Sequence, residues 1–84
     1  MLQIQSFEKA IHIGNNEYAK FIFNPIHVSG AVKYFVSVIY NGKLDHVFSM
    51  NFQNDNWKII MPEILPSWVK ELENELSLAI IENQ

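Results

Sequence analysis

The stretch LPSWVKELENELSLAIIE, residues 65–82, is the strongest indication of the fold, because its pattern predicts one helix after a long series of strand-like segments. Pro66 suits a first helical turn, where its fixed φ and missing N–H are tolerated. At about 100° per residue, one apolar stripe runs along this helix. The stripe consists of Trp68, Val69, Leu72, Leu76, Ala79 and Ile80. Such a stripe predicts that one side of the helix packs against a sheet.

Turn signals divide the preceding residues into five extended segments. Asn41-Gly42 is the strongest signal, because a two-residue type I′ turn needs positive φ at both central positions and these residues tolerate it. The segments predict strands at about 3–13, 17–28, 32–40, 43–52 and 57–60, followed by the helix at 65–82. We therefore predict one α+β domain over residues 1–84. Its antiparallel meander sheet of four to five strands is covered on one face by a single C-terminal helix.

Alternation of apolar and polar residues predicts the buried side of the fourth strand. The expected buried row is Leu44, Phe48, Met50 and Phe52. We expect Trp68 and Leu72 of the helix to dock on Phe48 and Phe52. Trp57 follows a polar turn, and we expect its indole to seal the end of the sheet.

Apolar residues outside this core are the candidate interaction sites. Leu78 and Ile81 lie off the helical stripe among polar residues, and Phe35 and Ile39 lie on the second face of the third strand. Single exposed apolar residues are normal, so Leu78 and Ile81 have two interpretations, ordinary surface residues or a subunit contact. A domain this small buries only about 60% of its unfolded surface, which favours stabilisation by dimerisation.

The sequence offers no catalytic or metal-binding pattern. His12, His27 and His46 fall on different predicted strands, without the paired spacing of a zinc site. Acidic residues at every second position of the helix point in different directions, as solvated charges do. No nucleophile elbow or glycine-rich phosphate loop occurs. We predict a protein that is not an enzyme and has no cofactor and no metal.

Cysteine usage and hydropathy bear on the compartment. The chain has no cysteine, so its fold needs no oxidising environment. The first residues lack the basic and apolar regions of a signal peptide, and no segment approaches the roughly twenty apolar residues of a membrane span. We expect a cytoplasmic protein without membrane contact.

The charge distribution bears on nucleic-acid binding. Residues 1–60 carry five lysines against four acidic residues, whereas residues 61–84 carry one lysine against five, and the chain has no arginine. Arginine is the usual bidentate reader of phosphate and guanine. The alternative to a protein-binding module is a weak single-strand nucleic-acid binder. Its predicted residues are Lys33, Lys43 and Lys58, with Tyr34, Phe35 or Trp57 as stacking platforms.

Two segments carry a resemblance to known proteins, Trp57-Lys58-Ile59 and the helix start Leu65-Pro66-Ser67-Trp68. Over about residues 57–81 the chain resembles short uncharacterised bacterial domains with a W-K-I segment before an L-P-x-W helix. That resemblance implies a bacterial protein and no particular activity.

The order of elements, without any shared motif, resembles the β-β-β-β-α layout of PC4-like and Whirly-type single-strand DNA-binding proteins. In the PC4-like family a curved sheet carries basic and aromatic residues, and the helix helps to form a dimer. This chain departs from that pattern because it lacks arginine and any basic run. The function expected first is therefore a non-catalytic, self-associating interaction module whose protein partner is not specified by the sequence.

We predict that the protein does not bind duplex DNA or RNA at physiological salt. The net charge is −3 and the cations are separate lysines, whereas non-specific affinity is built from many simultaneous phosphate contacts. The measurement is retention on DNA-cellulose at about 150 mM salt, near physiological ionic strength. Retention that disappears in Lys33→Glu with Lys43→Glu would contradict the prediction and favour binding by the sheet.

Overall fold

The computed structural model describes residues 5–14 and 16–83. Its strands and helices follow one another in this order: β1 Phe7–Gly14, β2 Glu17–Val28, β3 Ala31–Tyr40, β4 Lys43–Gln53, β5 Asn56–Ile59, the 3₁₀ turn η1 Pro62–Ile64, α1 Ser67–Lys70 and α2 Glu73–Glu82. Strand bounds agree with the prediction to within a residue or so for β2 to β5. The predicted start of the first strand, residues 3 and 4, lies outside the described residues.

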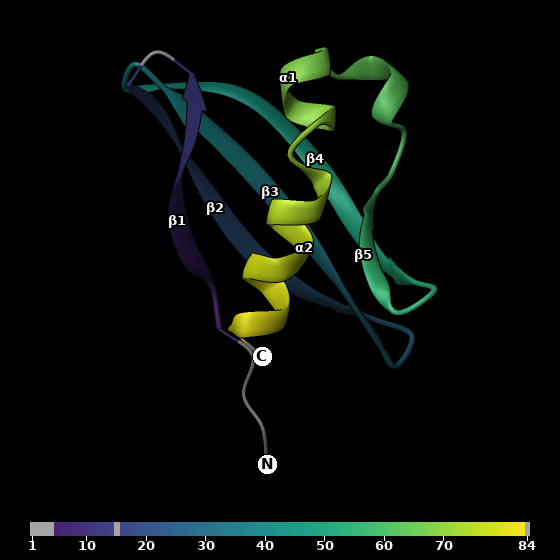
Figure 1. Cartoon of the computed structure of the whole chain (residues 1–84). Coiled ribbons are helices and arrows are strands. Elements are labelled where there is room, and N and C mark those ends of the chain that lie inside the picture. The colour runs from purple at the N-terminus through teal and green to yellow at the C-terminus, as the bar shows by residue number, and fades with distance from the viewer. Residues whose placement is uncertain (1–4, 15, 84) are drawn as a thin grey trace.

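The five strands form one antiparallel sheet in the order β1-β2-β3-β4-β5, which curls into a half-barrel (Figure 1). Two-residue turns join β2 to β3, β3 to β4 and β4 to β5, and both central residues of each have positive φ. In the predicted turn these angles are 53° at Asn41 and 74° at Gly42, as a type I′ turn requires. The predicted α+β class, the five-stranded meander and the C-terminal helix are confirmed.

The prediction of one unbroken helix over residues 65–82 is wrong, because α1 and α2 are separated at Glu71 and Leu72. Leu72 leaves the α region, with φ −89° and ψ 2°, and its N–H bonds to the carbonyl of Val69 in the tighter 3₁₀ manner. The carbonyl of Leu72 then accepts the first bond of α2, from the N–H of Leu76. No glycine or proline stands at this break, so the sequence gives no signal for it.

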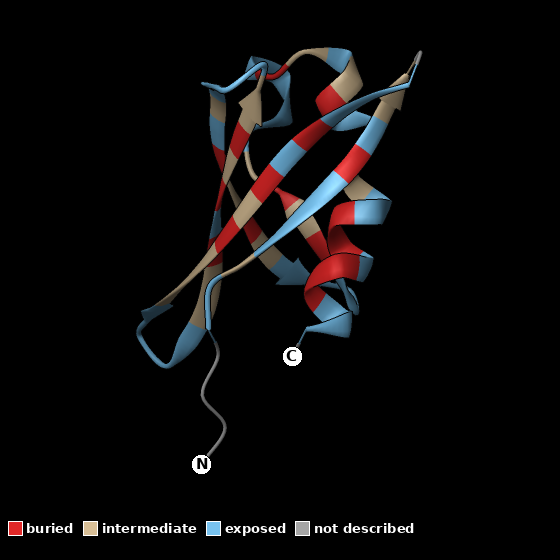
Figure 2. Cartoon of the chain, turned by 90° about the vertical axis from the view of Figure 1, so that its left-hand side faces the viewer, coloured by how far each residue is buried: buried red, intermediate tan, exposed pale blue. Residues whose placement is uncertain are grey.

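The core lies between the sheet and the two helices. Figure 1 shows α2 in front of the sheet, between the edge strands β1 and β5, and the buried residues of α2 lie on its side nearest the strands in Figure 2. Five of the six residues of the predicted stripe are buried: Val69, Leu72, Leu76, Ala79 and Ile80. Trp68 is only partly buried and packs against the edge of the core. Trp57 is 3% exposed, in agreement with its predicted sealing role.

The predicted buried row of β4 is half correct. Phe48 and Met50 are buried, whereas Leu44 and Phe52 are 62% and 54% exposed. The pairing of β4 with β3 shifts between Val38 and Ile39, which inserts one extra residue into β4 and moves Leu44 to the opposite side. Phe52 lies near the β4–β5 turn, where the centroid of its ring is 5.4 Å from that of the Trp57 ring.

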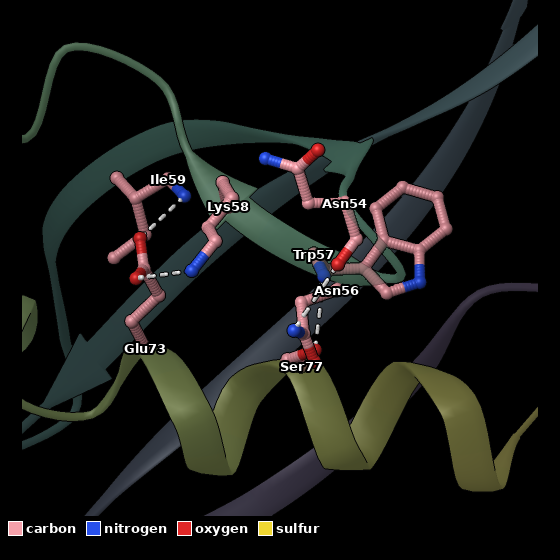
Figure 3. A network of polar contacts seen from close by, with 7 residues as sticks. All are labelled: Asn54, Asn56, Trp57, Lys58, Ile59, Glu73 and Ser77. Carbon is pink, nitrogen blue, oxygen red and sulfur yellow. Dashed lines mark hydrogen bonds and ion pairs between the residues drawn. The ribbon is translucent and has the colours of Figure 1, made fainter.

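Side chains of α2 occupy the free edge of β5. Ser77 Oγ accepts a hydrogen bond from the backbone N–H of Trp57 at 2.9 Å, and Glu73 Oε2 accepts one from the N–H of Ile59 at 2.9 Å (Figure 3). Glu73 also lies 3.8 Å from the Nζ of Lys58. Unpaired strand edges are templates for aggregation, so these bonds both orient α2 and protect β5.

We predict that Ser77→Ala lowers the free energy of unfolding by about 1–3 kcal/mol, because it leaves the buried N–H of Trp57 without an acceptor. Urea denaturation followed by tryptophan fluorescence measures the effect. Ser67→Ala is the matched control, since Ser67 is exposed at the start of α1 and should change stability by only about 0.5 kcal/mol or less. Equal effects of the two substitutions would contradict the assigned role of Ser77.

Candidate functional site

Five apolar side chains from three neighbouring strands form what we call the outer patch. Its members are Ile22, Phe35, Ile39, Leu44 and Val47. Phe35, Leu44 and Val47 are 42%, 62% and 52% exposed, and the two isoleucines are half-buried. Strand pairing places the patch in three adjacent rows. One row joins Ile22 through Ser37 to Val47, and the next joins Ile39 to Leu44. The third row holds Phe35 between Asn24 and Ser49.

The sequence pattern predicts only part of this patch. The predicted residues Phe35 and Ile39 belong to it on β3, on either side of Ser37, and Val47 joins them from β4. Leu44 was assigned to the core, because the extra residue in β4 reverses the alternation beyond it. A bulge of this kind has no signature in the sequence KLDHVFSMNF at residues 43–52.

The second pair of predicted interaction residues lies on α2. Leu78 and Ile81 are 57% and 42% exposed, while Ser77, Ala79 and Ile80 beside them are buried. They form a two-residue apolar strip, smaller than the outer patch.

The structure brings together only two residues of the nucleic-acid alternative, Lys33 and Trp57, which line the same groove. Tyr34 is 0% and Trp57 3% exposed, so neither ring presents a free face on which a base could stack. Lys33 and Lys43 lie near opposite ends of β3, because Lys43 pairs with Tyr40 at its far end. Lys58 lies 3.8 Å from the carboxylate of Glu73. The structure therefore does not gather these five residues into one surface.

A groove of about 750 Å³ opens beside the β2–β3 and β4–β5 turns. Its apolar lining comes from Val28, Val32, Phe52 and Trp57, and Lys33 supplies its cation. The exposed ring of Phe52 stands at this groove.

A second hollow, of about 410 Å³, has a different chemical character, and we call it the acidic hollow. It is lined by Ile13, Gly14, Glu17, Tyr40, Asp45 and Trp68. The Tyr40 hydroxyl donates a hydrogen bond to Glu17 Oε2, and this bond, together with burial and the charge of Glu17, raises the pKa of Tyr40. His46 lies next to the hollow, with its Nε2 3.3 Å from Asp45 Oδ2.

Two buried polar atoms find no hydrogen-bond partner among the described residues, the hydroxyl of Tyr34 and the indole N–H of Trp57. Their rings contact each other edge to face, with centroids 5.0 Å apart. Burial raises the pKa of the Tyr34 hydroxyl above its ordinary value of 10.0, because the phenolate would lose its hydration.

Comparison with protein-family models, with curated proteins and with solved structures finds no match to this chain. The likeness to PC4-like proteins therefore stays a prediction.

Residues 5–14 and 16–83 bring no three His, Cys, Asp or Glu side chains close enough together to hold a metal ion. Within the same ranges, no helix is long and apolar enough to cross a membrane. The surface features described above are the outer patch, the strip on α2, the groove at Phe52 and Trp57, and the acidic hollow.

We predict that Tyr34→Phe raises the free energy of unfolding by about 1 kcal/mol at neutral pH, because it removes a buried hydroxyl without a partner. In the wild type, the raised pKa means that stability is full below about pH 10 and falls as the pH rises through the folded-state pKa. Tyr34→Phe should weaken this alkaline loss. Urea denaturation of both proteins, at neutral pH and at a pH above about 10, measures the free energy of unfolding.

Tyr40→Phe is the matched control, since the hydroxyl of Tyr40 already bonds to Glu17. It should bring no gain in stability at neutral pH. A loss of stability in Tyr34→Phe equal to that in Tyr40→Phe would show that the Tyr34 hydroxyl has a partner in solution.

Proposed function

We propose that this protein is a non-catalytic interaction module that forms a homodimer through the outer patch. In this proposal the helices cover only one face of the sheet and leave the other face open to a second copy. The observation that carries it is the continuity of the patch, in which three side chains more than 40% exposed adjoin two half-buried isoleucines. Contiguous apolar surface of this kind is typical of interaction sites rather than of scattered surface residues.

The size of the open face supports a second copy as the occupant. The molecule measures 40 × 25 × 20 Å, so its two longer dimensions enclose about 1,000 Å², and the proposal places the open face on this side. A standard interface buries about 800 Å² on each partner, which this side can supply. Such a contact also removes apolar surface from water in a domain whose own core is small.

The charges beside the patch suit a two-fold contact. Two of the three rows that contain it carry one charge of each sign, Glu8 and Lys20, whose side chains lie 3.7 Å apart. A surface that pairs with itself around a two-fold axis must be self-complementary, and an apolar centre with balanced charges at its border meets this condition. Ser37 at the centre is small and uncharged, so it does not oppose close approach.

We predict that the wild type sediments as a dimer at micromolar concentration and that Val47→Lys weakens the dimer about tenfold or more. A buried cation in an apolar interface has no partner, and tenfold corresponds to about 1.4 kcal/mol. Sedimentation velocity over a concentration series measures the dissociation constant. Circular dichroism checks that the variant is folded.

Leu78→Lys is the matched control, because it makes the same chemical change at an equally exposed apolar residue on α2. It should leave the dissociation constant unchanged. Dissociation by Leu78→Glu with Ile81→Lys, while Val47→Lys stays dimeric, would place the contact on the helix. A monomeric wild type at high concentration would contradict self-association altogether.

A further inference from the structure

The walls of the acidic hollow include two electron-rich aromatic rings. The ring centroids of Tyr40 and Trp68 are 6.4 Å apart, and their planes are inclined by 48°. Two inclined rings form a corner in which one group can contact both. Both side chains are only partly buried, and both line the hollow. Aromatic faces of this kind attract cations within about 6 Å of the ring centroid.

Two carboxylates add negative charge to the same hollow. Glu17 and Asp45 come from the beginnings of β2 and β4, and neither lining carboxylate faces a lysine in an ion pair among the described residues. The contacts they do make are with Tyr40 and His46. A hydroxyl donor orients the Glu17 carboxylate without neutralising it. The described lining contains no basic side chain.

From this combination we propose that the acidic hollow binds an organic cation with a methylated ammonium head group. Carboxylates supply the charge, and the corner of Tyr40 and Trp68 supplies apolar contact and cation–π attraction, which together suit a cation that carries methyl groups. A metal ion prefers several oxygen ligands to aromatic walls. The volume of about 410 Å³ also exceeds what a bare ion needs.

The rest of the protein favours such a ligand. The chain carries a net charge of −3, which attracts cations at long range. The acidic hollow shares no residue with the outer patch, so the inference stands independently of the proposed dimer. A methylated ammonium group can belong to a small metabolite or to a methylated lysine side chain of another protein. The chemistry that recognises the head group is the same in both.

The experiment compares choline with 3,3-dimethylbutanol, which has the same shape but no charge. Titration followed by ¹⁵N–¹H NMR should show saturable shifts of the Trp68 indole N–H and the Gly14 amide with choline. We expect the uncharged isostere to bind at least about tenfold more weakly, which corresponds to about 1.4 kcal/mol. A parallel titration uses a peptide with one trimethyl-lysine and the same peptide with the uncharged tert-butyl analogue.

Variants assign the effect to the hollow. Trp68→Leu and Glu17→Gln should each weaken binding of the cation several-fold, whereas Trp68→Phe keeps an aromatic wall and should retain most of it. Glu63→Gln is the matched control, because it removes one negative charge from the exposed turn η1. It should leave the affinity unchanged.

The outcomes separate clearly. Tenfold preference for either the choline or the trimethyl-lysine peptide over its own uncharged analogue supports the proposal and identifies the source of the head group. Equal binding of charged and uncharged analogues, or no saturable shift with either cation, overturns it. Equal loss in Glu63→Gln and Glu17→Gln also overturns it, because the attraction would then reflect net charge alone.

Discussion

The contact between α2 and the free edge of β5 determines how the helices pack on the sheet. Glu73 and Ser77 are four residues apart, which is about 6 Å along a helix, and Trp57 and Ile59 are two apart, which is about 6.6 Å along a strand. The two spacings match, so two acceptors on one helix face meet two donors of the strand. This match fixes both the rotation and the position of α2. This position of α2 places the side chains of Leu76 and Ile80 in the core.

The placement of α2 explains where the half-barrel stays open. The helix runs from its contact with β5 to the neighbourhood of β1, where Glu82 lies 3.9 Å from Lys9. A single helix on this path, α2, does not cover both ends of the half-barrel. One end is the groove at Phe52 and Trp57, and the other is the acidic hollow at Tyr40 and Trp68. The two ends differ in charge because Lys33 lines the first and Glu17 the second.

Local signals in the sequence predict the strands and the helical region. They do not predict features that depend on contacts between elements. Turn residues such as Asn41-Gly42 act over two positions, and the helical stripe repeats over several turns, so strands and helix are readable. The break before Glu73 and the extra residue near Leu44 have no local signal, because each is set by fitting one element to another. The sequence pattern therefore predicts only part of the outer patch. No sequence pattern indicates the acidic hollow, because its residues come from five separate elements.

The two proposed binding surfaces, the outer patch and the acidic hollow, are compatible with each other because they share no residue. Burying Phe35 and Val47 against a second copy uses no residue that lines the hollow. A dimer joined through this patch therefore keeps two acidic hollows in one particle. For a partner that carries several methylated ammonium groups, a second contact becomes intramolecular and raises the overall affinity without any new interaction. In the proposed dimer, self-association would then contribute to recognition as well as to stability.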